Sequence, residues 1–131
     1  MIQKEITICG KKVNVAYCWA TEISYKILAD EDLPIFIKEV IQHISATPPT
    51  LPDARRSIFL IIAAMQAYYD SISQEMPVTD KDIMYNATAE ELCYAIGIIA
   101  GMHGLFYKTP EGEPDDKKTK KTKRKGKEKN S

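Results

Sequence analysis

Residues 53–74 read DARRSIFLIIAAMQAYYDSISQ, and this stretch decides the fold. Eight apolar residues follow one another from Ile58 to Met65, which is more than one face of a helix can hold. A helix that is apolar on all sides lies either in a membrane or in a protein core. Spanning a bilayer takes about 20 apolar residues, and this run stops at Gln66. The sequence therefore predicts a core helix, capped by Asp53 and enclosed by its neighbours.

The charge of the chain is divided unevenly along its 131 residues. The formal net charge is zero, but residues 111–131 hold nine basic and five acidic side chains, a net charge of +4. Residues 1–110 therefore carry a net charge of −4. The tail has no large apolar side chain that could offset the entropy of ordering it. We expect one folded domain over residues 1–110 and a disordered Lys-rich tail over residues 111–131.

The N-terminal residues 4–17 alternate between apolar and polar side chains, as a β-hairpin does. Gly10-Lys11 fits a type II′ turn with glycine at the first central position. That turn pairs Ile6 with Val15 and Ile8 with Val13, so that all four lie on one face. A two-stranded hairpin is marginal alone, so this face is expected to rest on helices or to pair with another chain.

Helical periodicity predicts four or five helices after the hairpin. In a helix over residues 19–29, Trp19, Ile23 and Ile27 mark the expected inner face. The next helix begins near Pro34, and its expected inner face consists of Leu33, Phe36, Ile37, Val40, Ile41 and Ile44. Three prolines make residues 47–52 a stiff connector to the core helix.

A capping box predicts the start of the last helix, with Thr88 at the N-cap and Glu91 three residues later. A short helix starting at Thr79 or Asp80 is expected before it. The inner face of the last helix is expected to hold Leu92, Ala95, Ile96, Ile99, Met102 and Phe106. Its three glycines are expected to pack against the core-helix alanines: Gly97, Gly101 and Gly104 against Ala63, Ala64 and Ala67. The predicted class is α+β, mainly α, with the hairpin packed on a helical bundle.

No pattern in the sequence points to catalysis, a metal or a cofactor. Cys9, Cys18 and Cys93 lack zinc-ligand spacing, and free buried thiols in a reducing cytosol explain them. His43 and His103 lie on helical apolar faces, where a packed structural histidine is the favoured interpretation over a ligand or general base. The N-terminus lacks the apolar core of a secretory signal. We expect a non-enzymatic, cytoplasmic protein with no membrane association.

Two groups of side chains are candidates for binding. Aromatic side chains with a polar tip are favoured at protein interfaces, and the candidate partner-binding residues are Tyr68, Tyr69, Tyr94 and Tyr107. Core packing is the alternative explanation for some of them. The candidate anion-binding residues of the tail are Lys117, Lys118, Lys120, Lys121, Lys123, Arg124 and Lys125. The tail has no aromatic residue on which bases could stack, so nucleic acid would be bound non-specifically. One alternative is that the tail is simply a solvated terminus. Another is that its A-rich codons cause ribosomal slippage, so that the role lies at the level of the gene.

Taken together, the layout resembles the tail assembly chaperones of long-tailed, siphovirus-like phages and prophages. The matching pieces are a hairpin with a Gly-Lys turn (6–15), an aromatic-led helix (19–28), a long apolar helix (58–72), the segment VTDKDIMYNATAEELCYAI (78–96) and a domain end at 107–110 before a charged tail. The resemblance covers most of residues 1–110. It implies a frameshifted longer product alongside the short one.

The resemblance also implies a function and partners. Such a protein binds the tape measure protein in the bacterial host cytoplasm, keeps it soluble and helps to recruit tail tube subunits, with many copies on one tape measure. Self-association into a homo-oligomer is also compatible with the sequence. The rival hypotheses are a nucleic-acid-associated protein that uses its basic tail and a small adaptor in another assembly.

Overall fold

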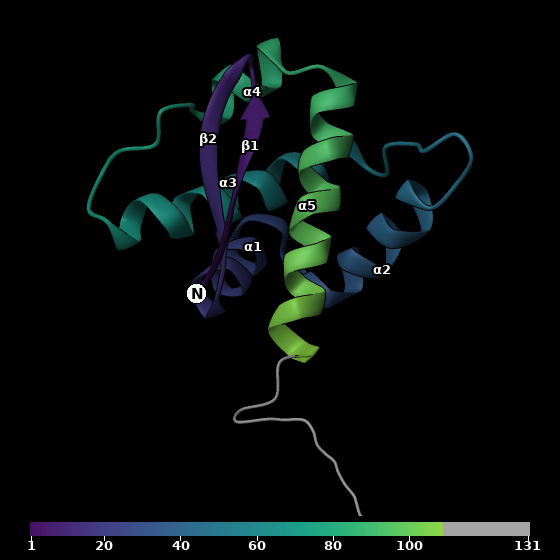
Figure 1. Ribbon diagram of the computed structural model, residues 1–131, viewed down its shortest axis with the longest axis horizontal. Coiled ribbons are helices and arrows are strands. Elements are labelled where there is room, and N and C mark those ends of the chain that lie inside the picture. The colour runs from purple at the N-terminus through teal and green to yellow at the C-terminus, as the bar shows by residue number, and fades with distance from the viewer. Residues whose placement is uncertain (109–131) are drawn as a thin grey trace, which may run out of the picture.

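Helix α3, Ala54–Ser71, is the centre of the fold. The computed structural model describes residues 1–108. The carboxylate of Asp53 accepts a hydrogen bond from the backbone N–H of Arg56 at 3.1 Å and so caps the first turn. Residues 60–65 are buried without interruption, as in a helix enclosed on all sides. The predicted core helix is confirmed, and Figure 1 shows it passing behind the N-terminal hairpin.

An antiparallel hairpin of β1, Ile2–Ile8, and β2, Lys11–Tyr17, opens the chain. Its turn is Cys9-Gly10 rather than the predicted Gly10-Lys11, and both turn residues have positive φ, 53° for Cys9 and 74° for Gly10. Positive φ at both positions is the mark of a type I′ turn, whose twist matches that of the strands. The glycine was therefore predicted at the wrong position of the turn.

The pairing of the strands is displaced from the predicted register by two residues. Ile6 lies opposite Val13, not opposite Val15. Because side chains alternate with a period of two, this displacement leaves every side chain on its predicted face. The four predicted inner residues are all buried: Ile6, Ile8, Val13 and Val15. β2 rests on α3 and β1 on α5, Ala89–Lys108, so the hairpin has the helical support it needs.

Helix α1, Trp19–Ala29, has the predicted bounds, but the face predicted to point inward points outward. The predicted inner residues Trp19, Ile23 and Ile27 face outward, with 61%, 60% and 76% of their surface exposed. The prediction that these residues belong to the core is wrong. The stripe is instead part of the molecular surface.

Tyr25 decides which face of α1 packs inward. Its ring stacks on Phe36 with centroids 5.9 Å apart, and its hydroxyl donates to Glu31 at 2.7 Å. Thr21 is also buried, and its hydroxyl donates to the carbonyl of Ala16 at 2.8 Å. These contacts join α1 to α2, to the loop between α1 and α2, and to the end of β2. Periodicity therefore predicts the helix but not the face that lies inside.

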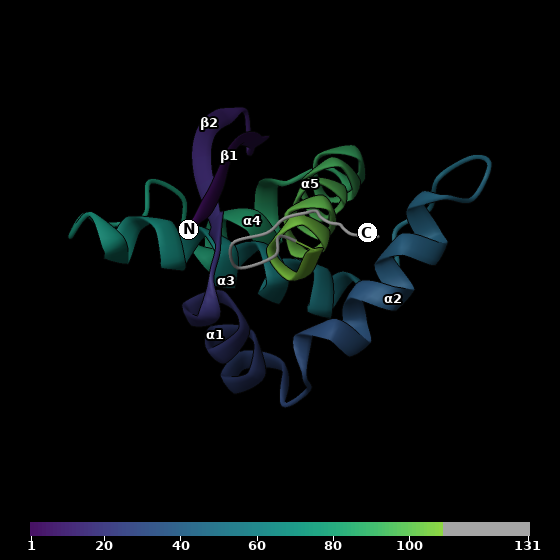
Figure 2. The same ribbon diagram turned by 60° about the horizontal axis from the view of Figure 1, so that its bottom comes forward.

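Helix α2, Leu33–Ile44, follows with Pro34 in its first turn, as predicted. Four of its six predicted inner residues are buried: Leu33, Phe36, Ile37 and Val40. Ile44 is half-buried and packs against the core, and only Ile41 was predicted wrongly, because it is 49% exposed. Figure 2 shows the reason: the C-terminal end of α2 and the connector after it lie at one edge of the molecule, away from the core.

Two capping boxes start the C-terminal helices, and the one at Thr88 and Glu91 was predicted. At α4, Asp80–Asn86, the N–H of Thr79 donates to the carboxylate of Asp82 at 3.0 Å, and the N–H of Asp82 donates to the Thr79 hydroxyl at 3.1 Å. At α5, Thr88 and Glu91 exchange the same two bonds, each at 3.1 Å. Each box satisfies backbone donors that a helix start leaves unpaired.

Helix α5 buries the face that its spacing predicts. Leu92, Ala95, Ile96, Ile99 and Met102 are buried, and Phe106 packs against the core. The prediction for its glycines is wrong, however. A Cβ added at Gly97 would lie 3.7 Å from Cδ1 of Ile44, and one added at Gly101 or Gly104 would meet no atom within 4 Å. Gly97 therefore lies beside α2, and Gly101 and Gly104 face open space, so none of the three packs against the alanines of α3.

The predicted class is confirmed: an α+β protein, mainly α, with an N-terminal hairpin packed on five helices over residues 1–108. Among these residues, none of the helices has the length and apolar character needed to cross a bilayer. The predicted disordered tail, residues 111–131, lies outside the described residues.

Candidate protein-binding surfaces

The outward side of α1 exposes three large apolar side chains. We call Trp19, Ile23 and Ile27 the α1 outer face. They follow one another at intervals of four residues and therefore form one continuous stripe along the helix. Single exposed apolar residues are common, whereas a contiguous apolar patch on a soluble protein marks an interaction site. The α1 outer face is thus a candidate protein-binding surface.

The end of α5 extends this surface. The indole of Trp19 packs edge-on against Phe106, with ring centroids 5.0 Å apart, and against Tyr107 at 6.2 Å. Tyr107 is 51% exposed, so it adds an aromatic ring with a polar tip beside the stripe. The sequence prediction that Tyr107 is available to a partner agrees with this position.

A shared carboxylate fixes this corner of the molecule. Glu22 on α1 accepts hydrogen bonds from the hydroxyls of Tyr17, at 2.7 Å, and of Tyr107. Burial and the bond to Glu22 raise the pKa of Tyr17, and the bond to Glu22 raises the pKa of Tyr107 to about 12. Both phenols therefore stay protonated and donate throughout the physiological range. The α1 outer face is in this way presented on a rigid support.

His103 is part of the same support. Its ring lies 5.5 Å from that of Tyr17 and 4.9 Å from that of Tyr107. Burial lowers its pKa below the usual 6.5, so the imidazole is neutral at pH 7. Its Nε2 is buried and has no hydrogen-bond partner among the described residues. His43 links α2 to the connector, with its Nδ1 2.9 Å from the Thr50 hydroxyl. Both histidines therefore have packing roles, as the sequence suggested.

A second apolar surface lies between α2, the connector and α5. It is a groove of about 740 Å³ lined by Ile44, Pro49, Leu51, Ala89, Glu90, Cys93, Tyr94, Gly97 and Ile98. Tyr94 is 61% exposed. The groove is apolar apart from the carboxylate of Glu90 and the tip of Tyr94. Its chemistry is that of a surface which receives another apolar side chain or helix.

The other predicted binding residues do not join these surfaces. Tyr69 is only 8% exposed, and its hydroxyl accepts a hydrogen bond from the N–H of Asn14 at 3.1 Å. Tyr68 is half-buried with its ring 4.9 Å from that of Tyr69. Tyr69 ties α3 to β2 and offers little surface to a partner. The predicted anion-binding residues, 117–125, lie outside the described residues.

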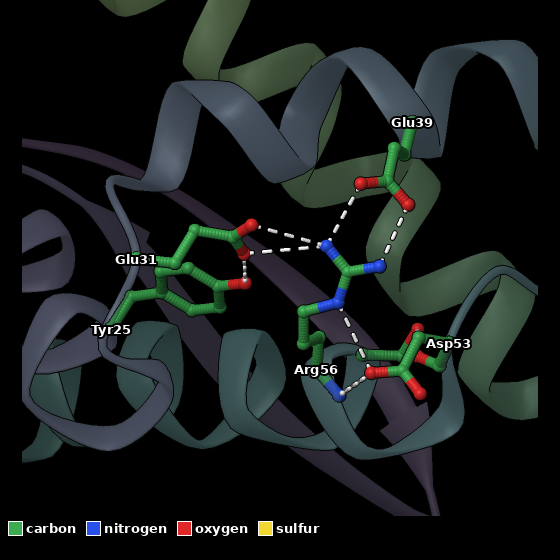
Figure 3. Close-up of polar contacts among 6 residues, drawn as sticks. Tyr25, Glu31, Glu39, Asp53 and Arg56 are labelled. Carbon is green, nitrogen blue, oxygen red and sulfur yellow. Dashed lines mark hydrogen bonds and ion pairs between the residues drawn. The ribbon is translucent and has the colours of Figure 1, made fainter.

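The densest polar cluster surrounds Arg56 and is structural (Figure 3). Its guanidinium bonds both oxygens of Glu39, at 2.8 and 2.7 Å, Glu31 at 3.2 Å and Asp53 at 3.1 Å. It also lies 4.6 Å from the ring centroid of Phe36. The cluster joins α2, α3 and the α1–α2 junction. Sequence reasoning missed it, because the pairing of residues so far apart leaves no local signal.

Within residues 1–108, no group of three or more His, Cys, Asp and Glu side chains is arranged to hold a metal ion. The three cysteines are free, as expected, but half-buried rather than buried. Burial raises the pKa of the Cys93 thiol, and burial together with Glu91 and Asp82 raises that of Cys9.

Comparison of the chain with protein-family models, with curated proteins and with solved structures finds no match.

Proposed function

We propose that this protein is a non-catalytic assembly chaperone that holds an apolar helical segment of another protein. The observation that carries the proposal is the α1 outer face: Trp19, Ile23 and Ile27 are each at least 60% exposed. A helix normally turns such a stripe toward its own core. Here the core is completed by Tyr25 on the opposite side, so the stripe is left for a partner.

The resemblance in layout suggests the partner. We take it to be the tape measure protein of a phage tail, with tail tube subunits recruited afterwards. A long helical protein presents apolar stripes with the same spacing of three and four residues, and one helix laid along another buries both. Its apolar surface must be covered before assembly if it is to stay soluble.

The size of the α1 outer face sets the strength expected of one contact. Full burial of an isoleucine side chain contributes about 1.5–3 kcal/mol, and association itself costs several kcal/mol. Two isoleucines and a tryptophan therefore support a weak, reversible contact. Weak contacts suffice if many copies act along one long partner, because multivalency raises the overall affinity.

Co-expression with the tape measure protein tests the proposal. The double variant Ile23→Glu/Ile27→Glu should fold normally but leave the tape measure protein in the insoluble fraction. The matched control is Gln3→Glu/Thr7→Glu, which adds the same charge at exposed positions of β1. This control should keep the partner soluble. A folded double variant that solubilises the partner as well as the unmodified chain does would refute the role of the α1 outer face.

Removal of residues 111–131 separates this proposal from a nucleic-acid role of the basic tail. The truncated chain should still keep the tape measure protein soluble. If solubilisation is lost while the domain stays folded, the tail rather than α1 carries the activity.

A further inference from the structure

The side of α5 that faces away from the core carries a stripe of its own. We call Tyr94, Ile98, Gly101 and Leu105 the α5 outer stripe; Tyr94 and Ile98 also line the groove between α2, the connector and α5. The residues of the stripe are spaced by 4, 3 and 4 residues and, at 100° per residue, fall within an arc of about 60°. Tyr94 is 61% and Leu105 49% exposed, Gly101 is exposed, and Ile98 is half-buried. Figure 1 shows α5 in front of α3.

The order of residue sizes in this stripe makes it complementary to itself. When two α5 helices pack antiparallel about a two-fold axis near residues 99–100, Tyr94 of each copy meets Leu105 of the other. Ile98 of each copy then meets Gly101 of the other. A Cβ built at Gly101 meets no atom within 4 Å, so this position is an open notch that a facing isoleucine can enter. Small residues of this kind let two helix backbones approach closely.

The charges at the two ends of the stripe fit the same arrangement. Glu90 lies in the first turn of α5 and Lys108 in the last, and both are exposed. At 100° per residue both lie in line with the α5 outer stripe. They are about 27 Å apart along one helix, too far to pair with each other. In the antiparallel pair, Glu90 of each copy faces Lys108 of the other at both ends of the contact.

We infer that a second copy of this chain is the occupant of the α5 outer stripe, in a two-fold symmetric dimer with the two α5 helices antiparallel. An interface of this type uses the same patch on both copies, so the patch must match itself in shape and charge. An unrelated helix would fit the apolar residues but would not explain acid and base at the two ends. Antiparallel packing also places the opposite ends of the two helix dipoles together.

None of the residues of the α5 outer stripe belongs to α1, so the proposed dimer contact does not use the α1 outer face. Each assembly then presents two partner-binding faces instead of one. Two linked weak contacts bind more tightly than either alone when both reach the same partner. The inference does not depend on the proposed function.

Sedimentation of the full chain, from about 1 µM to about 1 mM, tests the inference. The unmodified chain should convert from monomer to dimer within this range. Gly101→Gln, which fills the notch with a residue that favours helix, should raise the dissociation constant at least tenfold. Gly104→Gln, with the same change outside the arc, is the matched control and should leave it nearly unchanged.

Charge reversal supplies a second, independent measurement. Glu90→Lys alone and Lys108→Glu alone each bring like charges together at both ends and should weaken self-association. A mixture of the two single variants brings opposite charges together and should give a heterodimer in preference to either homodimer at low salt. A chain that stays monomeric throughout, or a dimer unaffected by Gly101→Gln and by charge reversal, would overturn the inference.

Discussion

Arg56 holds together three segments that are far apart in the sequence. Its partners Glu31 and Glu39 are 25 and 17 residues away. The Arg56 side chain is only 22% exposed, so its loss leaves partly buried carboxylates without a cation. We expect Arg56→Met to lower the free energy of unfolding by about 2 kcal/mol. Arg55→Met is the control: this neighbour is exposed and lies 4.7 Å over the ring of Phe59, so about 0.5 kcal/mol is expected. Urea denaturation at pH 7 measures both.

Acid should weaken the same cluster. The hydrogen bond from Arg56 lowers the pKa of Glu39 below 4.5. Burial alone would raise the pKa of Asp53, but hydrogen bonds from the backbone and side chain of Arg56 bring it below 3.8. A carboxyl with a lowered folded-state pKa stabilises the fold above its unfolded pKa, and this contribution is lost as the pH falls through the folded value. The unmodified chain should therefore lose more stability below pH 4.5 than Arg56→Met does. Equal losses in denaturation curves at pH 7 and pH 3 would contradict this assignment.

Glu91 connects two elements, the hairpin turn and the start of α5. Its carboxylate accepts the N–H of Cys9 at 3.1 Å and that of Gly10 at 3.0 Å, besides the N–H of Thr88 in the capping box. These bonds hold a turn in which Cys9 has positive φ, a conformation that non-glycine residues seldom adopt. The turn is thus stabilised from outside the hairpin.

We expect Glu91→Ala to destabilise the protein by about 2 kcal/mol, because it removes a cap and leaves turn amides without an acceptor. Hydrogen exchange of the Cys9 and Gly10 amides should become faster. In Glu90→Ala, a control at the adjacent exposed position, exchange of these two amides should not change. Unchanged exchange in Glu91→Ala would show that the carboxylate does not hold the turn.

The elements could be predicted where the signal is local. Asp53, Thr79 and the Thr88–Glu91 pair cap the helices that the sequence assigns to them. The register of the hairpin was missed because Gly10 can be the first or the second residue of a two-residue turn. The turn that forms is held by the carboxylate of Glu91, which is distant in the sequence. The orientation of α1 was missed because a bulky residue, Tyr25, lies opposite its apolar stripe. Contacts with Phe36 decide between the two faces, and these depend on how the helices come together.

At the scale of the whole molecule, most of the core could be predicted, whereas the sequence pointed to only part of the candidate binding surface. Tyr94 and Tyr107 are exposed as expected, whereas Tyr69 is buried. The α1 outer face was overlooked because an apolar stripe on a helix usually indicates the core side. An apolar stripe that faces solvent instead of the core is unusual, and this is the reason to regard it as a candidate functional surface. A folded chain that leaves Ile23 and Ile27 in water has a surface suited to another protein.

Thermal unfolding of two matched variants tests most directly whether α3 is buried while the apolar stripe of α1 is exposed. Ile61 is fully buried in α3 and Ile27 is 76% exposed on α1. Ile61→Asp buries an unpaired charge and should abolish cooperative unfolding. Ile27→Asp should melt within about 3 °C of the unmodified chain. An Ile27→Asp protein that fails to fold, as Ile61→Asp should, would show that α1 turns its apolar face inward and would contradict the account.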